Sequence, residues 1–269
     1  MKDRYKQKFA QLKERKEKAL IPFVVAGDPD YNTSLQIVKT IIDSGADILE
    51  LGFAFSEPIA DGPTIHAAGQ RALKAGADTD KNFEFVRKIR KYDKHIPIGI
   101  LIYSNLIYQR SIAKFYKDAK AAGIDSVLVA DLPIEEAGEY INHAKKNKVS
   151  TVFIVSQLTS DERMKRIAGK TDGFVYVVSR LGVTGARKEL GKGTLSLIKR
   201  IRPKTSLPIC VGFGISAPEQ VRSVTKEGAD GAIVGSAIVK MIEKNIKNHA
   251  ELLKSLKDYI KALKKATFR

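Results

Sequence analysis

The chain has 269 residues, of which 43% are hydrophobic and only one is a cysteine, and its formal net charge is +17. This hydrophobic share excludes wholesale disorder, and a single cysteine excludes a disulfide framework or a cysteine zinc cluster. The apolar runs are too short to span a bilayer and none follows the charged N-terminus, so we expect a soluble, cytoplasmic protein without a membrane contact or secretory signal.

A short β-branched run, a turn rich in Gly, Asp or Pro, and a longer helical stretch recur along the chain. The eight runs predict strands at 21–26, 47–51, 98–102, 126–130, 151–155, 174–178, 209–212 and 231–234. Helices are expected around 33–44, 64–75, 82–92, 111–122, 135–147, 160–168, 194–201 and 217–227, with a long one from about 237. A further helix is predicted within residues 1–19, and 241–269 are expected to form a C-terminal helix.

The positive charge is concentrated at the two predicted terminal helices. Residues 1–20 and 240–269 together carry +11 of the +17. Apolar residues recur at helical spacing between the C-terminal lysines: Leu252, Leu253, Leu256, Ile260 and Leu263. A nucleic-acid groove would instead interleave clustered cations with aromatic residues or glycines. We therefore expect solvated helix faces and no nucleic-acid partner, although the charge can attract an anionic substrate.

The order of these elements predicts the fold. Three helices are followed by similar four-residue motifs, at 44–47, 122–125 and 227–230. The glycine of each motif is expected to cap the helix and turn the chain toward the next strand. Near-continuous apolar strands that alternate with helices are typical of a parallel sheet covered on both faces. Eight such units predict an α/β fold, a single (β/α)8 TIM barrel over 1–269 with its core at 20–240 and an extra N-terminal helix. An open doubly wound sheet is the alternative.

The second predicted strand carries the first candidate catalytic residue. Its alternation places Leu49 and Leu51 on one face and Glu50 on the other. If the leucines pack under the helices, Glu50 points into the barrel mouth, where the active sites of such barrels lie. Partial desolvation would raise the pKa of Glu50, which suits a proton donor near neutral pH. The alternative is a glutamate paired with a buried arginine or lysine.

A second carboxylate, Asp61, follows in a loop that two prolines and a glycine constrain. Acid–base work often needs two groups held at different pKa values, so a carboxylate near Glu50 fits such chemistry. Because Asp61 lies next to the expected start of a helix, it is equally compatible with an N-cap or an Asx-turn.

Glycine-rich turns after the last three strands predict a phosphate site. They lie at 179–187, 212–216 and 235–237. Glycines let backbone N–H groups approach an anion, and a helix N-terminus adds partial positive charge. Loops after strands seven and eight of a barrel frequently bind phosphate. The scattered histidines show no metal-ligand spacing, Cys210 is expected to pack as a small hydrophobe, and no dinucleotide or nucleotide-triphosphate motif follows a strand.

Taken together, the motifs resemble those of the tryptophan synthase alpha chain family. The match begins with Leu49-Glu50-Leu51-Gly52 running into Asp61-Gly62-Pro63-Thr64-Ile65. Around it stand Pro22-Phe23-Val24, Gly27-Asp28-Pro29, Tyr103-Ser104-Asn105, Ala130-Asp131-Leu132-Pro133, Gly182-Val183-Thr184-Gly185, Gly212-Phe213-Gly214-Ile215 and Gly235-Ser236-Ala237-Ile238-Val239. The matches follow in order across roughly residues 20–240, and this coverage makes the resemblance specific.

The resemblance implies retro-aldol cleavage of indole-3-glycerol phosphate to indole and glyceraldehyde 3-phosphate, without a metal or an organic cofactor in this chain. Glu50 would be the general acid/base and Asp61 would stabilise the charge of the protonated ring. The phosphate would rest on Gly185, Gly214, Gly235 and Ser236. The substrate pocket would be lined by Phe23, Leu101, Tyr103, Leu128, Ile154, Tyr176, Thr184, Phe213 and Ile233. In the family, indole passes to a pyridoxal-phosphate (PLP)-dependent beta chain within an alpha2beta2 tetramer.

The sequence departs from the family pattern in the loop after the second strand. The family usually has Pro-Phe-Ser-Asp-Pro there, whereas this chain has Ala54-Phe55-Ser56-Glu57-Pro58. Because that loop faces the beta chain in the family, the departure puts the strength of coupling to a beta chain in doubt. Two rival functions stay open at this point: another phosphosugar barrel enzyme, and a non-catalytic activator of a beta chain.

Overall fold

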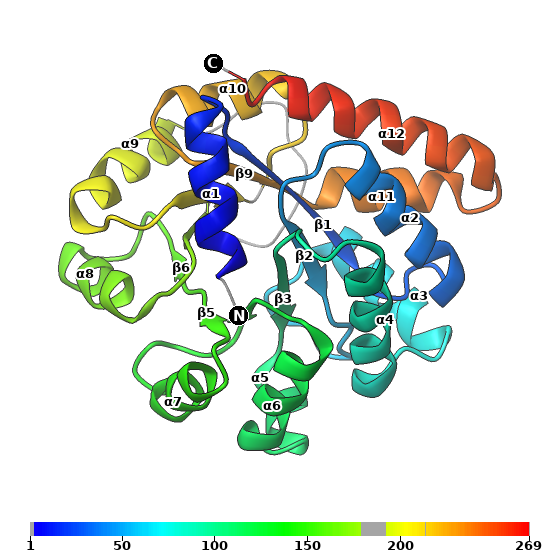
Figure 1. Ribbon diagram of the computed structural model, residues 1–269, viewed down its shortest axis with the longest axis horizontal. Helices are drawn as coiled ribbons and strands as arrows, with labels where there is room; N and C mark the ends of the chain where they lie inside the picture. Colours follow the sequence, from blue (N-terminus) through cyan, green and yellow to red (C-terminus); the bar gives the residue numbers. More distant parts are fainter. Residues whose placement is uncertain (1–2, 179–191, 213, 269) are drawn as a thin grey trace.

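The computed structural model describes residues 3–178, 192–212 and 214–268. These residues form nine strands in one parallel sheet, in the order β5-β4-β3-β2-β1-β9-β8-β7-β6. The strands are β1 (Ala19–Val25), β2 (Leu49–Gly52), β3 (Ile98–Ile102), β4 (Ser126–Val129), β5 (Ser150–Thr151), β6 (Ile154–Val155), β7 (Val175–Val178), β8 (Ile209–Gly212) and β9 (Gly231–Val234). The predicted (β/α)8 barrel is confirmed, with helices arranged around central strands (Figure 1).

The ninth strand arises because the predicted fifth strand, 151–155, is divided in two. β5 and β6 stand at the two ends of the sheet order, yet only Val152 and Phe153 separate them along the chain. The Val152 N–H donates to the Val127 carbonyl at 3.1 Å, and the Phe153 carbonyl accepts from the Tyr176 N–H at 3.2 Å. The two short strands therefore continue each other and join the ends of the sheet.

The helices cover the outside of this sheet. They are α1 (Arg4–Glu14), α2 (Tyr31–Asp43), α3 (Pro63–Lys74), α4 (Thr79–Tyr92), α5 (Ser104–Gln109), α6 (Ile112–Ala122), α7 (Gly138–Lys146), α8 (Asp161–Lys170), α9 (Lys192–Ile201), α10 (Pro218–Lys226), α11 (Ser236–Asn245) and α12 (His249–Lys265). The expected N-terminal helix is confirmed as α1. None of the helices in the described residues is long and apolar enough to cross a membrane.

One helix prediction was wrong, and one short helix was missed. The continuous helix expected from about 237 is broken into α11 and α12, because the Asn248 side chain caps a new helix by accepting the Glu251 N–H at 3.2 Å. The short helix α5 was not predicted at all. Its first residue, Ser104, donates its N–H and its hydroxyl to the Asp131 carboxylate, each at 2.8 Å, so a residue distant in sequence fixes the start of α5.

Side chains alternate between two apolar layers along each strand. Leu49 and Leu51 belong to the large core between the sheet and the helices, as predicted, whereas Ile48 belongs to the core inside the barrel. Cys210 is fully buried in the inner core and packs as a small hydrophobe, again as predicted. In α12 the lysine-rich face is exposed and the apolar stripe packs into the outer core through Leu252, Leu253, Leu256, Ile260 and Leu263.

Each of the three similar motifs makes the same kind of hydrogen bond at the amino-terminal ends of the strands. Their glycines, Gly45, Gly123 and Gly228, have φ values of 104°, 92° and 105°, the left-handed conformation expected of such caps. The aspartate two residues later accepts the backbone N–H of the neighbouring strand. The pairs are Leu20 with Asp47, Ile98 with Asp125 and Ile209 with Asp230, at 2.9, 2.9 and 3.0 Å.

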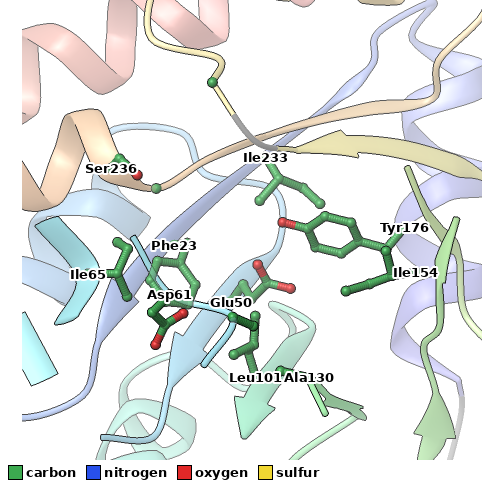
Figure 2. A pocket seen from close by; sticks show the side chains of 13 residues that line it. Phe23, Glu50, Asp61, Ile65, Leu101, Ala130, Ile154, Tyr176, Ile233 and Ser236 are labelled. Carbon is green, nitrogen blue, oxygen red and sulfur yellow. The ribbon is translucent and has the colours of Figure 1, made fainter. Parts of the chain in front are cut away.

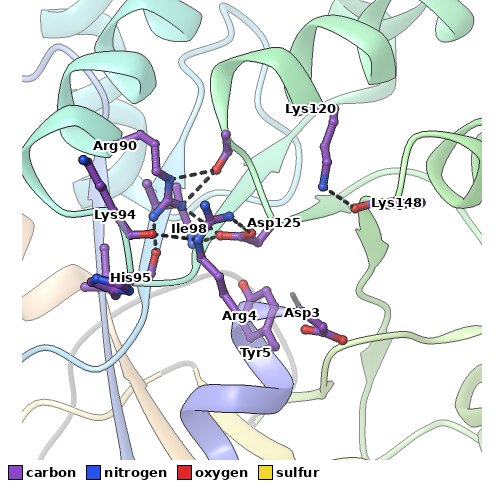
Figure 3. Close-up of polar contacts among 12 residues, drawn as sticks. Asp3, Arg4, Tyr5, Arg90, Lys94, His95, Ile98, Lys120, Asp125 and Lys148 are labelled. Carbon is purple, nitrogen blue, oxygen red and sulfur yellow. Dashed lines mark hydrogen bonds and ion pairs between the residues drawn. The ribbon is translucent and has the colours of Figure 1, made fainter. Parts of the chain in front are cut away.

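Asp125 also pairs with two arginines. Its carboxylate pairs with Arg4 of α1 at 2.8 Å and with Arg90 of α4 at 2.9 Å, in addition to the Ile98 N–H (Figure 3). The side chains of Asp125, Arg90 and Arg4 are only 9%, 13% and 16% exposed. This ionic cluster therefore connects the N-terminal helix, α4 and two strands.

We expect Asp125→Ala to destabilise the fold by about 3 kcal/mol, because it leaves two largely buried guanidinium groups and a strand N–H without their acceptor. The matched control is Asp161→Ala. Asp161 also pairs with two cations, Arg200 and Lys204, but is 59% exposed, so its loss should cost far less stability than the loss of Asp125. Urea unfolding measures both values. Equal losses for the two variants would contradict the role of burial.

Helix α1 also closes the barrel at the amino-terminal ends of its strands. Tyr5 of α1 is 1% exposed, its hydroxyl shares a 2.8 Å hydrogen bond with the Ser126 hydroxyl, and its ring packs 5.6 Å from that of Phe174. An added Cβ at Gly99 would come within 2.8 Å of the Tyr5 hydroxyl, so this glycine makes room for the tyrosine. The barrel interior is thereby shielded from water at the end opposite the strands' carboxyl termini.

Candidate active site

A cavity lies at the carboxyl ends of the strands, where the sequence predicts the site (Figure 2). Many of the predicted site residues line it: Phe23, Glu50, Asp61, Leu101, Ile154, Tyr176, Gly214, Ile233, Gly235 and Ser236. Three lining residues, Ala60, Ile65 and Ala130, were not predicted. Small or aliphatic side chains carry no chemical signal in a sequence, so only their place in the fold could reveal them.

The remaining predicted residues fall into two groups. Tyr103 is not part of the lining but contacts Asp61, and Leu128 is buried in the inner core without reaching the cavity. Ala130, two residues further along on the same face, lines the cavity, and the place of Leu128 in the substrate pocket stays a prediction. Thr184, Gly185 and Phe213 lie outside the described residues.

Glu50 is held in an apolar setting by its neighbours in the sheet. It pairs in register with Phe23 of β1 and Gly99 of β3, and only 4% of it is exposed. Its Oε2 has no hydrogen-bond partner within the part of the chain that the structure describes, and none of the ion pairs among those residues involves Glu50, so no described arginine or lysine neutralises it. Burial alone raises the pKa of Glu50 to about 8. The predicted rise in pKa is confirmed.

Asp61 lies beside Glu50 in the cavity lining but in a more polar setting. The Tyr103 hydroxyl donates a hydrogen bond to the Asp61 carboxylate. The same hydroxyl accepts a hydrogen bond from the Ala60 N–H at 3.1 Å. Burial raises the pKa of Asp61 to about 6, while the Tyr103 hydrogen bond and the charge of His66 oppose the rise. Helix α3 has Gly62 as its N-cap, so the N-cap alternative for Asp61 is wrong.

The two carboxyl groups are therefore in different protonation states at neutral pH. With pKa values of about 8 and about 6, Glu50 is mostly protonated and Asp61 is mostly ionised. One apolar cavity thus holds a proton donor and a negative charge, the arrangement that separates acid and base roles. Such a pair can protonate a substrate and stabilise the cation that results.

One end of the cavity is suited to an anion. Gly214, Gly235 and Ser236 all line the cavity, and Ser236, which Figure 2 labels, is the first residue of α11. The first N–H groups of a helix have no partner within the helix and carry partial positive charge. An added Cβ at Gly235 would stand 3.1 Å from Cδ1 of Phe23, so a side chain there would crowd both the ring and the approach to α11.

Two further glycines leave room for the aromatic rings that line the cavity. An added Cβ at Gly52 would come within 2.7 Å of Cζ of Phe23, and one at Gly212 within 2.7 Å of Cζ of Tyr176. In Figure 2 the Glu50 carboxyl group stands between these two rings. Among residues 3–178, 192–212 and 214–268, no group of three or more His, Cys, Asp or Glu side chains is placed to hold a metal ion.

The model of the family described as tryptophan synthase alpha chain matches residues 9–268. The chain belongs to the tryptophan synthase alpha chain family. A tryptophan synthase alpha chain from Methanothermobacter thermautotrophicus is 48% identical over 248 residues, which cover 92% of each chain. One from Escherichia coli is 44% identical and covers 99% of this chain and 100% of its own.

Solved structures agree with this family. One match is a chain from the tryptophan synthase alpha2beta2 complex of Pyrococcus furiosus, a structure that describes the basis of mutual activation in that complex. Its TM-score is 0.85 and its sequence identity 41%, over 92% of this chain and 98% of that one. Tryptophan synthase subunit alpha from Legionella pneumophila matches with a TM-score of 0.91 and 31% identity over 99% of both chains. The tryptophan synthase alpha chain is the lyase subunit that cleaves indole-3-glycerol phosphate, and this membership excludes a different phosphosugar barrel.

Proposed function

We propose that this chain cleaves indole-3-glycerol phosphate with Glu50 as general acid/base and Asp61 as the balancing negative charge. The observation that carries the proposal is the pair of carboxyl groups in one apolar cavity, one with its pKa raised to about 8 and the other to about 6. The reaction needs a proton first delivered to the substrate and then removed from it, and a group near its pKa at working pH does both.

In the proposed reaction, the Glu50 carboxyl group gives its proton to the indole carbon that bears the glyceryl chain. The ring nitrogen becomes cationic, and its N–H donates to the ionised Asp61. The Glu50 carboxylate then takes the proton of the hydroxyl on the adjoining carbon. As that C–C bond breaks, its electrons neutralise the ring, which gives indole and glyceraldehyde 3-phosphate and returns the proton to Glu50.

The purified chain mixed with indole-3-glycerol phosphate tests the activity directly, with formation of indole as the readout. Indole formed by the chain alone supports catalysis by this chain. If no indole forms alone or with a beta chain, the chain is a non-catalytic activator and the proposal fails.

The phosphate is proposed to rest against Gly214, Gly235 and Ser236. We expect Gly235→Leu to weaken glycerol 3-phosphate binding at least about tenfold, because its side chain obstructs the approach to the N-terminus of α11. Calorimetric titration measures the binding, and circular dichroism checks the fold. The control is Gly169→Ala, since an added Cβ at Gly169 meets nothing within 4 Å. Unchanged binding in Gly235→Leu would place the phosphate elsewhere.

We also propose a beta chain as the partner, with the alpha2beta2 assembly of the Pyrococcus furiosus complex as the precedent and PLP held by that partner. Contacts of the loop at 54–58 connect the surface that a partner could bind with Asp61 in the site. Glu57 is exposed, while the Phe55 ring stacks 5.2 Å from that of Tyr103, whose hydroxyl contacts Asp61. A partner that orders this loop would therefore stabilise the position of Asp61.

The altered loop is expected to weaken coupling to the beta chains of typical members. Proline at position 54 would restrict the open states of the loop, and Glu57 carries the charge one methylene further out than aspartate. Ala54→Pro/Glu57→Asp should then reach half-maximal indole formation at about two- to fivefold less of a typical beta chain than wild type. A titration of both proteins with that beta chain measures the difference. Coincident curves would show that the two substitutions are neutral.

A further inference from the structure

We propose that Arg71 is a positioning residue, which holds helix α3 at the mouth of the barrel and thereby fixes the place of Asp61. The inference rests on the proposed function, in which Asp61 balances the charge of the substrate ring. Asp61 lies two residues before Pro63, the first residue of α3. Ile65, in the first turn of α3, lines the same cavity as Asp61. A displacement of α3 would therefore displace part of the wall of the site.

Helix α3 is held in place by little apolar surface. Its buried residues are Ile65, Ala68, Gly69 and Ala72. Ile65, Ala68 and Ala72 pack into the core inside the barrel. Two of the four buried residues contribute a single methyl group and one has no side chain, whereas hydrophobic stabilisation scales with the apolar area that is removed from water. Apolar packing alone therefore holds α3 weakly, and a polar contact can decide its position.

The Arg71 guanidinium group makes such a polar contact. Its Nε and Nη2 atoms donate to the two carboxylate oxygens of Asp28, at 2.7 and 3.0 Å. The side chain of Asp28 is 0% exposed and that of Arg71 is 22% exposed. A bidentate pair between a planar guanidinium group and a carboxylate fixes the orientation of the two groups as well as their distance. The pair therefore defines where this part of α3 lies.

Asp28 is itself fixed at the end of β1. Its N–H donates to the Val25 carbonyl at 3.2 Å, and the Gly27 N–H donates to the Ser34 hydroxyl at 3.1 Å. In the sheet, β1 is the neighbour of β2, the strand that carries Glu50. The ion pair thus connects the helix that follows one carboxyl group of the site to the strand beside the other. It contributes in this way to the relative position of the two groups.

A second carboxylate contacts the same arginine and provides a matched control. Glu243 of α11 accepts from Nη1 of Arg71 at 3.3 Å, but its side chain is 46% exposed. Exposed ion pairs contribute little to stability, because water screens their charges. The loss of Glu243 should therefore leave α3 in place, whereas the loss of Arg71 should not.

Hydrogen exchange of the full chain, labelled with ¹⁵N and followed by NMR, tests the position of α3 without reference to catalysis. In Arg71→Met, the backbone amides of α3 should exchange at least about tenfold faster than in wild type, because the helix opens more often. The amides of α6 should exchange as in wild type. Glu243→Gln should match wild type in both helices. Unchanged exchange of α3 in Arg71→Met would overturn the proposal.

The rate of indole formation tests the consequence for the site. Arg71→Met should lower kcat at least about tenfold, since a small displacement of Asp61 removes charge stabilisation from the transition state. Its affinity for glycerol 3-phosphate should stay within about twofold of wild type, because the proposed phosphate site lies at the N-terminus of α11. Asp125→Ala, which loses a buried ion-paired carboxylate at the opposite end of the barrel, should keep the wild-type kcat. An equal fall of kcat in Asp125→Ala would assign the effect to lost stability and overturn the proposal.

The double variant Asp28→Asn/Arg71→Met separates positioning from charge compensation. It leaves neither charge of the pair buried and unpaired, so it should fold, yet fast exchange of α3 and low kcat should persist. Arg71→Lys keeps a point charge for Asp28, and its kcat should lie between those of Arg71→Met and wild type. Wild-type exchange and kcat in the double variant would show that Arg71 only neutralises Asp28, and would overturn the proposal. A wild type that forms no indole would refute the proposed function, while exchange would still decide what holds α3.

Discussion

Glu50→Gln is expected to lower cleavage of indole-3-glycerol phosphate by at least about 100-fold, because the amide cannot deliver or accept the proton. Binding of a substrate analogue should survive, since the amide keeps the shape of the side chain. Steady-state indole formation and calorimetric binding measure the two effects. Near-normal cleavage by the variant would contradict the proposed mechanism.

The same substitution should change how stability depends on pH. The pKa of Glu50 is raised from 4.5 to about 8 by burial, so its contribution to stability is complete below pH 4.5 and is lost as the pH rises toward 8. Glutamine never ionises, so Glu50→Gln should match wild type near pH 4.5 and exceed it by up to about 5 kcal/mol above pH 8. Urea unfolding at both pH values tests this. Parallel pH dependence in the two proteins would mean that Glu50 is hydrated.

Asp61→Asn is expected to lose most cleavage activity, because an amide cannot balance the charge of the protonated ring. In the wild type, activity should fall below about pH 6, where Asp61 becomes protonated, and above about pH 8, where Glu50 loses its proton. The expected profile of kcat/KM is therefore a bell between these values. Substantial activity of Asp61→Asn would assign the balancing charge to another group.

Tyr103→Phe provides the matched control for Asp61. The Tyr103 hydrogen bond lowers the pKa of Asp61, so its removal should raise that pKa and move the acidic limb of the profile to higher pH. The alkaline limb, which belongs to Glu50, should stay in place. An unshifted acidic limb would show that another group titrates there.

The two catalytic candidates differ in how far the sequence could predict them. The alternation of Leu49, Glu50 and Leu51 is enough to place Glu50 inside a barrel, and its burial there follows from the fold class. The setting of Asp61 depends on a loop, and loop conformation has no periodic signal. Its contact with Tyr103, which follows a different strand, appears only in three dimensions.

The break between α11 and α12 depends on a single side chain, Asn248, whose capping role competes with continued helix.

By itself the sequence determined the barrel, the order of its strands and helices, and the inward position of Glu50, because strand and helix periodicity depends on residues adjacent in the chain. Tertiary structure alone decided the separation of the two pKa values. Desolvation of Glu50 depends on Phe23, Tyr176 and the closure of the barrel by Tyr5, residues up to 126 positions away in the chain. A pKa reports the groups that surround a side chain in space, and no local pattern encodes which groups those are.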